Sequence, residues 1–296
     1  MKYLSVFFIF LLVVLTDVVD DVLLGYVLGN VSSVVTVIVL WYLVAFFAGL
    51  ISVYLTKPNN TDLTNFKKFK WQSFGYFLSS IIAAVSFFFA IVYIGISGNA
   101  ILSNFSVVFL VLFGVVFLKE KLSLKQLFAG LLIIFGLFIF SFGVEPASKL
   151  GVVFGLIAVS GGTVMKIFHK TLSTKINYQI ITTLRAFFIL LVILAVMFAL
   201  NLQFEFLLSP LIYLAIIGGA VSGPILNKQL MFKVLQSMKL SVFSLSFQIS
   251  TILVFILGLI LLGESASPLK ITGAVFVFVG AIIIQFNEKK TWILEE

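Results

Sequence analysis

Two stretches of the chain decide its fold: residues 117–136 read FLKEKLSLKQLFAGLLIIFG, and residues 261–280 read LLGESASPLKITGAVFVFVG. In each stretch an apolar run leads to a glutamate and a short polar turn, and a second apolar run follows. The residues that match differ by 144 in number: Gly114 and Gly258, Glu120 and Glu264, and Gly136 and Gly280. A constant offset across helix, turn and helix predicts an internal repeat.

The composition around these stretches is that of a membrane protein. Of 296 residues, 62% are hydrophobic and only 10% are charged, whereas soluble domains carry about 25% charged residues. Too few charges remain to cover a water-facing surface, which excludes a soluble enzyme, a secreted domain, a disordered chain and a nucleic-acid binder. The net charge of +8 fits lysine-rich cytoplasmic loops instead.

Apolar runs of about 20 residues, the length that crosses a bilayer as a helix, divide the whole chain. They do not alternate apolar with polar residues, as the strands of a membrane barrel do. The sequence therefore predicts an all-α polytopic membrane protein with ten transmembrane helices. The expected spans are 3–28, 32–55, 73–96, 99–118, 124–143, 150–169, 177–200, 210–233, 240–262 and 267–286.

The basic residues set the orientation. With the N-terminus in the cytoplasm, all of the 19 basic residues except Lys149, Lys270 and Arg185 fall on the cytoplasmic side, as the positive-inside rule requires. Both termini are then cytoplasmic, and we expect a bacterial plasma membrane. Five helices per copy force the second copy to enter upside down. The predicted organisation is a repeat over 1–145, an inverted repeat over 146–290 and a tail over 291–296.

Two halves of five helices, each ending in helix, glutamate, turn, helix and glycine, resemble the EamA-like branch of the drug/metabolite transporter superfamily. The resemblance covers about residues 3–286. It implies a central cavity that opens to alternate sides, with the fifth and tenth helices as support or dimer contacts. It also implies a structural role for the motif residues, and we expect the acids Glu120 and Glu264 to favour the N-terminal end of the helix that follows each of them.

Three acids lie inside the first predicted span. Asp17, Asp20 and Asp21 are spaced i, i+3, i+4 and share one helical face. A helix ending at Thr16 would be too short to span, so the helix must continue through them, with Asp17 about 20 Å from the inner end. One interpretation is a site for a cation or proton facing the cavity. The other is an acidic patch at the outer interface.

Two basic residues lie inside later spans. Arg185 either holds a substrate carboxylate or phosphate, or reaches back to the inner headgroups. Lys228 follows Pro224, which breaks its helix as in many transporter binding regions. Substrate binding competes there with headgroup contact or a structural ion pair. Lys166 is interpreted as an orientation charge, and His169 as a headgroup-region residue.

Two amides occupy equivalent positions in the repeat. Asn104 and Gln248 differ by 144 in number and need hydrogen-bond partners inside the protein. They bind either substrate or a neighbouring helix.

A secondary transporter of a small polar metabolite, amino-acid-like or an amine, fits these residues best, and the resemblance favours export. The alternatives are an exchanger of an anionic metabolite, such as a phosphorylated sugar or nucleotide sugar, and a non-transporting structural subunit. With no cysteine and one histidine, we expect no enzyme, metal site or cofactor. The expected partners are a small-molecule substrate and the lipid bilayer, with protons and a second copy of the chain as candidates, and no nucleic acid.

Overall fold

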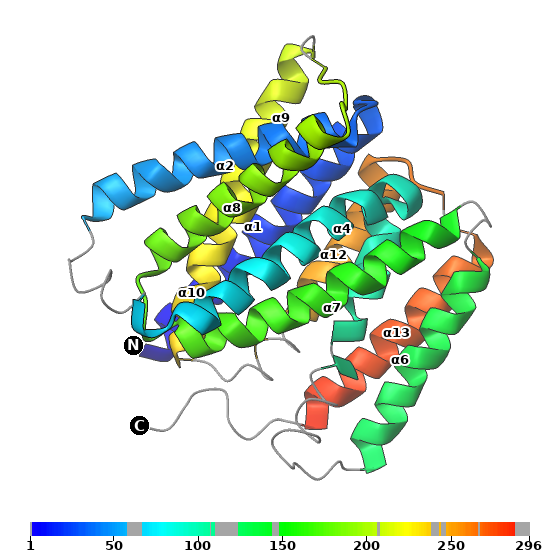
Figure 1. The fold of residues 1–296 in the computed structure, drawn as a ribbon. Helices are drawn as coiled ribbons and strands as arrows, with labels where there is room; N and C mark the ends of the chain where they lie inside the picture. Colours follow the sequence, from blue (N-terminus) through cyan, green and yellow to red (C-terminus); the bar gives the residue numbers. More distant parts are fainter. Residues whose placement is uncertain are drawn as a thin grey trace.

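The computed structural model describes residues 2–57, 67–106, 108–109, 124–143, 148–205, 208–237, 243, 247–265 and 267–287. Within these ranges the regular elements are helices (Figure 1). They are α1 (Lys2–Asn30), α2 (Val34–Thr56), α4 (Lys70–Ser103), α6 (Leu124–Phe142), α7 (Lys149–Leu172), α8 (Tyr178–Ala199), α9 (Pro210–Ala220), η2 (Val221–Asn227), α10 (Lys228–Ser237), α12 (Gln248–Leu261) and α13 (Pro268–Asn287).

The helices confirm an all-helical polytopic membrane protein. Five of the described helical segments are long and apolar enough to cross a bilayer: 34–56, 70–103, 149–172, 178–199 and 210–237. Shorter apolar helices cover 127–140, 249–261 and 268–280. The part of the predicted fourth span from 110 to 118, and the tail 291–296, lie outside the described residues.

Two pairs of helices begin at residues that differ by the offset of the predicted repeat. Both α2 and α8, and likewise α6 and α13, begin 144 residues apart. The start signals also correspond. The hydroxyl of Ser33 accepts a hydrogen bond from the amide of Thr36, and the side chain of Asn177 accepts one from the amide of Ile180, both at 3.2 Å. These caps satisfy backbone donors at the helix start.

The third and fourth predicted spans are separated close to the break that the sequence predicts near residue 97. The element α4 covers both of them, but its backbone leaves the helical conformation at Gly95, which has φ 72° and ψ 173°. Only glycine adopts this conformation at little cost. The chain therefore changes direction at one residue rather than through a loop.

The span around Pro224 contains the expected irregularity. α9 passes directly into the π-helical segment η2, which contains Pro224, and η2 passes into α10. Proline lacks an amide hydrogen and clashes with the preceding turn, and a π-helical segment absorbs that defect without ending the helix. Such segments are frequent at functional sites.

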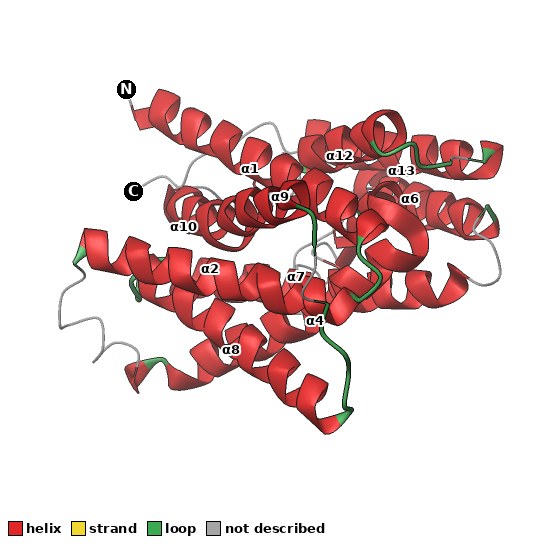
Figure 2. Ribbon diagram, turned by 90° about the horizontal axis from the view of Figure 1, so that it is seen from above, coloured by secondary structure: helices red, strands yellow, loops and turns green. Residues whose placement is uncertain are grey.

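The helices form a main bundle and a separate pair. In the bundle, α4 packs along α7, α2 packs along α8, and α1 lies among α9, η2, α10 and α12. The pair of α6 and α13 lies side by side at one edge (Figures 1 and 2). Glycines bring this pair together: a Cβ at Gly136 would lie 2.7 Å from the carbonyl oxygen of Gly273, and one at Gly280 would lie 2.8 Å from that of Ala129.

Candidate functional site

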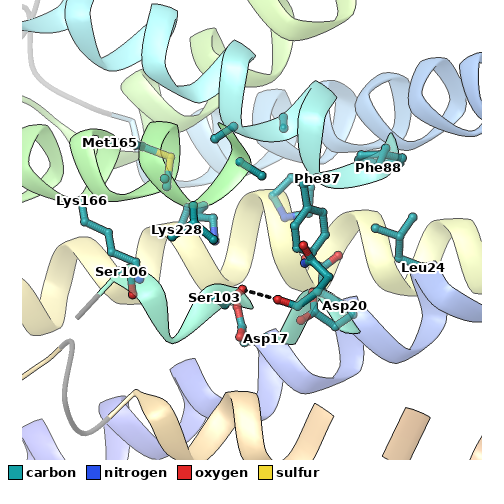
Figure 3. Close-up of a pocket in the computed structure, with 18 of the residues that line it drawn as sticks. Asp17, Asp20, Leu24, Phe87, Phe88, Ser103, Ser106, Met165, Lys166 and Lys228 are labelled. Atoms are coloured by element: carbon teal, nitrogen blue, oxygen red, sulfur yellow. Dashed lines mark hydrogen bonds between the residues drawn. The ribbon is translucent and has the colours of Figure 1, made fainter. Parts of the chain in front are cut away.

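A cavity of about 180 Å³ lies inside the main bundle. Its wall includes the three aspartates of α1, together with Arg185 of α8 and Lys228 of α10. Trp41, Tyr42, Phe87 and Phe88 contribute aromatic surface. Figure 3 shows Asp17 and Asp20 on one side of this space and Lys166 and Lys228 on the other. The structure therefore brings together acids and bases that are far apart in the sequence.

The three carboxyl groups differ in their surroundings. Ser250 of α12 donates a hydrogen bond from its hydroxyl to Asp17 Oδ2 at 2.6 Å. Asp20 lies against the backbone of Gly223 in η2, where any Cβ would overlap its carboxyl group. The Oδ1 atom of Asp20 is buried and has no hydrogen-bond partner. All three acids line the cavity.

Arg185 is buried beside the acids rather than reaching the headgroups. It is only 5% exposed, and its guanidinium carbon lies 5.9 Å from the centre of the Tyr42 ring. Its Nε and Nη1 atoms have no hydrogen-bond partner. A buried guanidinium with unused donors is costly unless an anion meets it, and its forked donors suit a carboxylate or phosphate.

The lysines of the cavity have different partners. Lys228 donates a hydrogen bond to Asn227 Oδ1 at 2.9 Å, and Asn227 in turn donates from Nδ2 to the carbonyl oxygen of Val13 at 2.8 Å. Lys166 was expected to be an orientation charge, but it lines the cavity, with Nζ 5.4 Å from the centre of the Phe247 ring. The sequence misplaces Lys166 because a charge near a helix end gives no sign of the direction in which its side chain points.

Of the two predicted amides, the structure describes the side chain of Asn104 alone. Asn104 is fully buried between helices: its Nδ2 donates to the carbonyl oxygen of Ala100 at 3.0 Å, and Thr251 donates to its Oδ1 at 3.5 Å. It is absent from the cavity wall. The backbone of Gln248 begins α12, and its side chain lies outside the described residues. Asn99 lines the cavity instead, with an unpartnered Oδ1.

Two residues at or beside the cavity were not singled out from the sequence. Tyr42 lines the cavity under Arg185, and Asn227, which is not part of the wall, links α1 to the wall residue Lys228. Asn227 directly precedes Lys228 in an apolar span, so its polarity was an available signal. Tyr42 gave none, because aromatic side chains are common on every face of these helices.

Glu264 of the repeated motif caps a different helix from the one expected. Its two carboxyl oxygens accept hydrogen bonds from the amides of Ile96 (2.7 Å) and Ser97 (2.9 Å), just after the turn at Gly95. The start of α13 is capped by Ser267, whose hydroxyl accepts from the amide of Lys270 at 3.3 Å. Gly258 permits the approach, since a Cβ there would lie 2.9 Å from Ile96 Cγ1. Glu120 and Gly114 lie outside the described residues.

The interpretation of His169 as a headgroup-region residue was wrong. It is fully buried rather than at the headgroups, and its Nε2 lies 3.1 Å from the hydroxyl of Tyr76.

The side chains of the cavity wall suit a small organic ion. Within the described part of the chain, no group of three or more histidine, aspartate or glutamate side chains is placed to hold a metal ion. The cavity instead offers acids, unused guanidinium donors and aromatic rings within a single space. Such a cavity can hold a small molecule that carries charge and an apolar body.

A charged, ring-lined cavity inside a bundle of membrane helices defines an integral membrane protein of the solute-transport class. The chain belongs to the EamA-like transporter family, whose sequence profile matches residues 4–142 and again residues 149–286. The protein is thus a membrane transporter rather than an enzyme. Among proteins with curated descriptions, none has a significant sequence match.

The fold is shared with solved structures. One, titled "Crystal structure of protein", is similar to this chain with a TM-score of 0.67 and 12% sequence identity, over 97% of this chain and 99% of that one. At this identity the likeness establishes the fold alone.

Proposed function

We propose that this protein is a secondary transporter that moves a small zwitterionic or cationic metabolite, amino-acid-like or an amine, by alternating access. The observation that carries the proposal is the pair of unused, buried groups in one cavity: Asp20 Oδ1 and the Arg185 Nε and Nη1 atoms. An amine would meet the acids of α1, and a carboxylate would meet Arg185. The rings of Trp41 and Phe88 would contact the apolar body of the solute.

The proposed architecture is ten transmembrane helices in two inverted repeats, over 1–145 and 146–290. The two family matches, the common offset of the helix starts and the matching caps at Ser33 and Asn177 support it. Both termini would lie in the cytoplasm of a bacterial cell, and export would be the direction of transport. In such transporters the substrate site is formed where a discontinuous helix meets the cavity, and here the interrupted segment η2 contributes Pro224 to the cavity wall.

A second candidate is an exchanger of anionic metabolites, such as phosphorylated sugars. Arg185, Lys166 and Lys228 in one wall favour it. The three acids oppose it, because they would repel the ligand. The third candidate, a non-transporting subunit, gives no ligand to offset the cost of burying the charges of the cavity.

Ligand-induced thermal stabilisation of the purified protein separates these candidates. We would compare amines, amino acids and phosphorylated metabolites. A ligand that binds only the folded state at 100 times its dissociation constant adds about 2.7 kcal/mol, which raises the melting temperature measurably.

The proposal predicts stabilisation by cationic or zwitterionic solutes that is lost in Asp20→Asn. Lys175→Gln serves as a control for charge removal outside the cavity, because Lys175 lies over the Phe69 ring. Stabilisation only by phosphorylated anions, kept in Asp20→Asn and lost in Arg185→Gln, would establish the anion exchanger instead.

A further inference from the structure

Beyond the cavity, four fully buried side chains close one end of the bundle. They come from four helices, α4, α7, α8 and α10, and we call them the plug: Tyr76, His169, Ile181 and Phe232. The ring centres of His169 and Phe232 are 4.2 Å apart, and those of Tyr76 and His169 are 4.9 Å apart. Tyr76, Ile181 and Phe232 belong to a hydrophobic cluster separate from the main core, and the His169 ring packs against two of them.

Each plug residue lies on the same helical face as a residue of the cavity wall. His169 follows Lys166 by three residues, Ile181 precedes Arg185 by four, and Phe232 follows Lys228 by four. On α4, Ser80 lies four residues before the cavity residue Ala84, and Tyr76 lies four before Ser80. Residues three or four apart are neighbours on one face of a helix. The plug therefore lies one to two turns beyond the cavity on all four helices.

This end of the bundle is the basic one. α4 and α8 begin here, and α7 and α10 end here (Figure 1). Described lysines near these helix ends are Lys67, Lys68, Lys70, Lys170, Lys175 and Lys233. An excess of lysine marks the cytoplasmic side of a membrane protein.

The closed packing leaves polar atoms unsatisfied. His169 Nδ1, Ser73 Oγ, Ser80 Oγ and Gln179 Oε1 are buried and have no hydrogen-bond partner. Buried polar atoms are normally paired, so four unpaired ones around one plug do not suit a permanent core. Water or a passing solute would satisfy them once the rings separate.

We infer that the plug is the cytoplasmic gate of the transporter, and that Ser80 and Gln179 line the passage it opens. The inference rests on the proposed function, since a gate needs a second state. Phe232 and Ile181 keep the passage dry when closed, and the polar atoms around them line it when open.

Single-cysteine labelling tests the gate, because the chain has no cysteine of its own. Ser80→Cys places one thiol behind the plug. Leu78→Cys is the matched control on the same helix: Leu78 is 47% exposed and faces outward, where lipid covers it. A membrane-impermeant thiol reagent is added to inverted or right-side-out vesicles, and transport of the solute panel is measured in parallel.

The gate predicts that Ser80→Cys reacts from the cytoplasmic side at least about tenfold faster than Leu78→Cys, because a thiol must reach water to form a reactive thiolate. Phe232→Ala in the same background should raise that rate further, since the ring no longer blocks the passage. Labelling should also stop transport.

Reaction of Ser80→Cys no faster than Leu78→Cys from either side, in vesicles that transport, would overturn the gate. Equal reaction from both sides would overturn it too. One-sided labelling in a protein that transports none of the solutes would contradict the proposed function while still supporting a plug that opens.

Discussion

The cavity and the α6–α13 pair are built on opposite principles. The pair is held by glycines that let two backbones touch, at Gly136, Gly273 and Gly280. The cavity wall holds charged groups with unused hydrogen-bonding atoms, Asp20 and Arg185, beside an interrupted helix. Packing of the first kind stabilises a fold, whereas unused buried charge costs stability. Under the proposed function the cavity would bind the solute, whereas the closely packed α6–α13 pair would stabilise the fold.

Removing a charged side chain from the cavity wall is expected to have the largest effect on transport. Arg185→Gln should lower the transport rate at low substrate concentration by about 100-fold, because a hydrogen bond to a charged group contributes about 1.5–3 kcal/mol. The melting temperature should fall only slightly, since Arg185 Nε and Nη1 have no hydrogen bond to lose and only the contact with Tyr42 is removed. Uptake into proteoliposomes measures the first quantity, with Lys175→Gln as the control for charge. Unchanged uptake by Arg185→Gln would remove Arg185 from the site.

A large side chain between α6 and α13 should lower the stability of the fold and leave substrate binding unchanged. Gly136→Leu should destabilise the fold by about 1–3 kcal/mol through overpacking, since even a Cβ would lie 2.7 Å from the Gly273 carbonyl oxygen. The apparent KM of the surviving protein should be unchanged. Gly130→Leu on the same helix is the control, because nothing lies within 4 Å of a Cβ there. Thermal unfolding in detergent would show the difference, and equal melting of the two variants would refute the close contact.

A substitution at Ser250 is expected to have a smaller effect on solute binding. Ser250→Ala removes the 2.6 Å hydrogen bond to Asp17 and should weaken binding of a cationic solute by about tenfold, as expected for one hydrogen bond to a charged group. Ser160→Ala is the matched control, because that hydroxyl bonds only the carbonyl oxygen of Leu156 in its own helix. Titration by ligand-induced melting measures the affinity. Equal affinities in the two variants would show that Asp17 does not contact the solute.

The smallest effect is expected at the repeated glutamate. Glu264→Gln places an amide donor against the amides of Ile96 and Ser97 and should cost about 1 kcal/mol, as for the loss of a helix cap. Glu205→Gln is the control, because Glu205 accepts from the exposed hydroxyl of Ser32 rather than from a helix start. Thermal unfolding compares the two, and a lower melting temperature for Glu205→Gln would contradict the capping role.

Much of the fold follows from local patterns in the sequence. Apolar length predicted the helices, and Pro224 predicted the irregular span, because bilayer thickness and proline geometry act locally. The break between the third and fourth spans was predicted near residue 97 and lies at Gly95. The contact of Glu264 with Ile96 was missed, because these two residues are 168 apart in the chain and no local pattern records their meeting.

The sequence predicted which charged residues belong to the candidate site, but not which side chains contact one another there. Asp17, Asp20, Asp21, Arg185 and Lys228 stand out because charge is costly inside a membrane. The direction of each side chain is set by tertiary packing. Lys166 therefore turned out to line the cavity, Asn104 to bond its neighbours and His169 to be buried in the plug.

In the proposed function, the acids of α1 and Arg185 bind opposite ends of one solute. Counterflow in proteoliposomes tests it most directly, with a transported amino acid compared against two analogues, one lacking the amine and one lacking the carboxylate. The account predicts that each analogue exchanges at least about tenfold more slowly than the parent, since each forfeits a charged contact. Equal or faster exchange of the analogue without the amine would contradict a role for the acids of α1 and favour an anion exchanger.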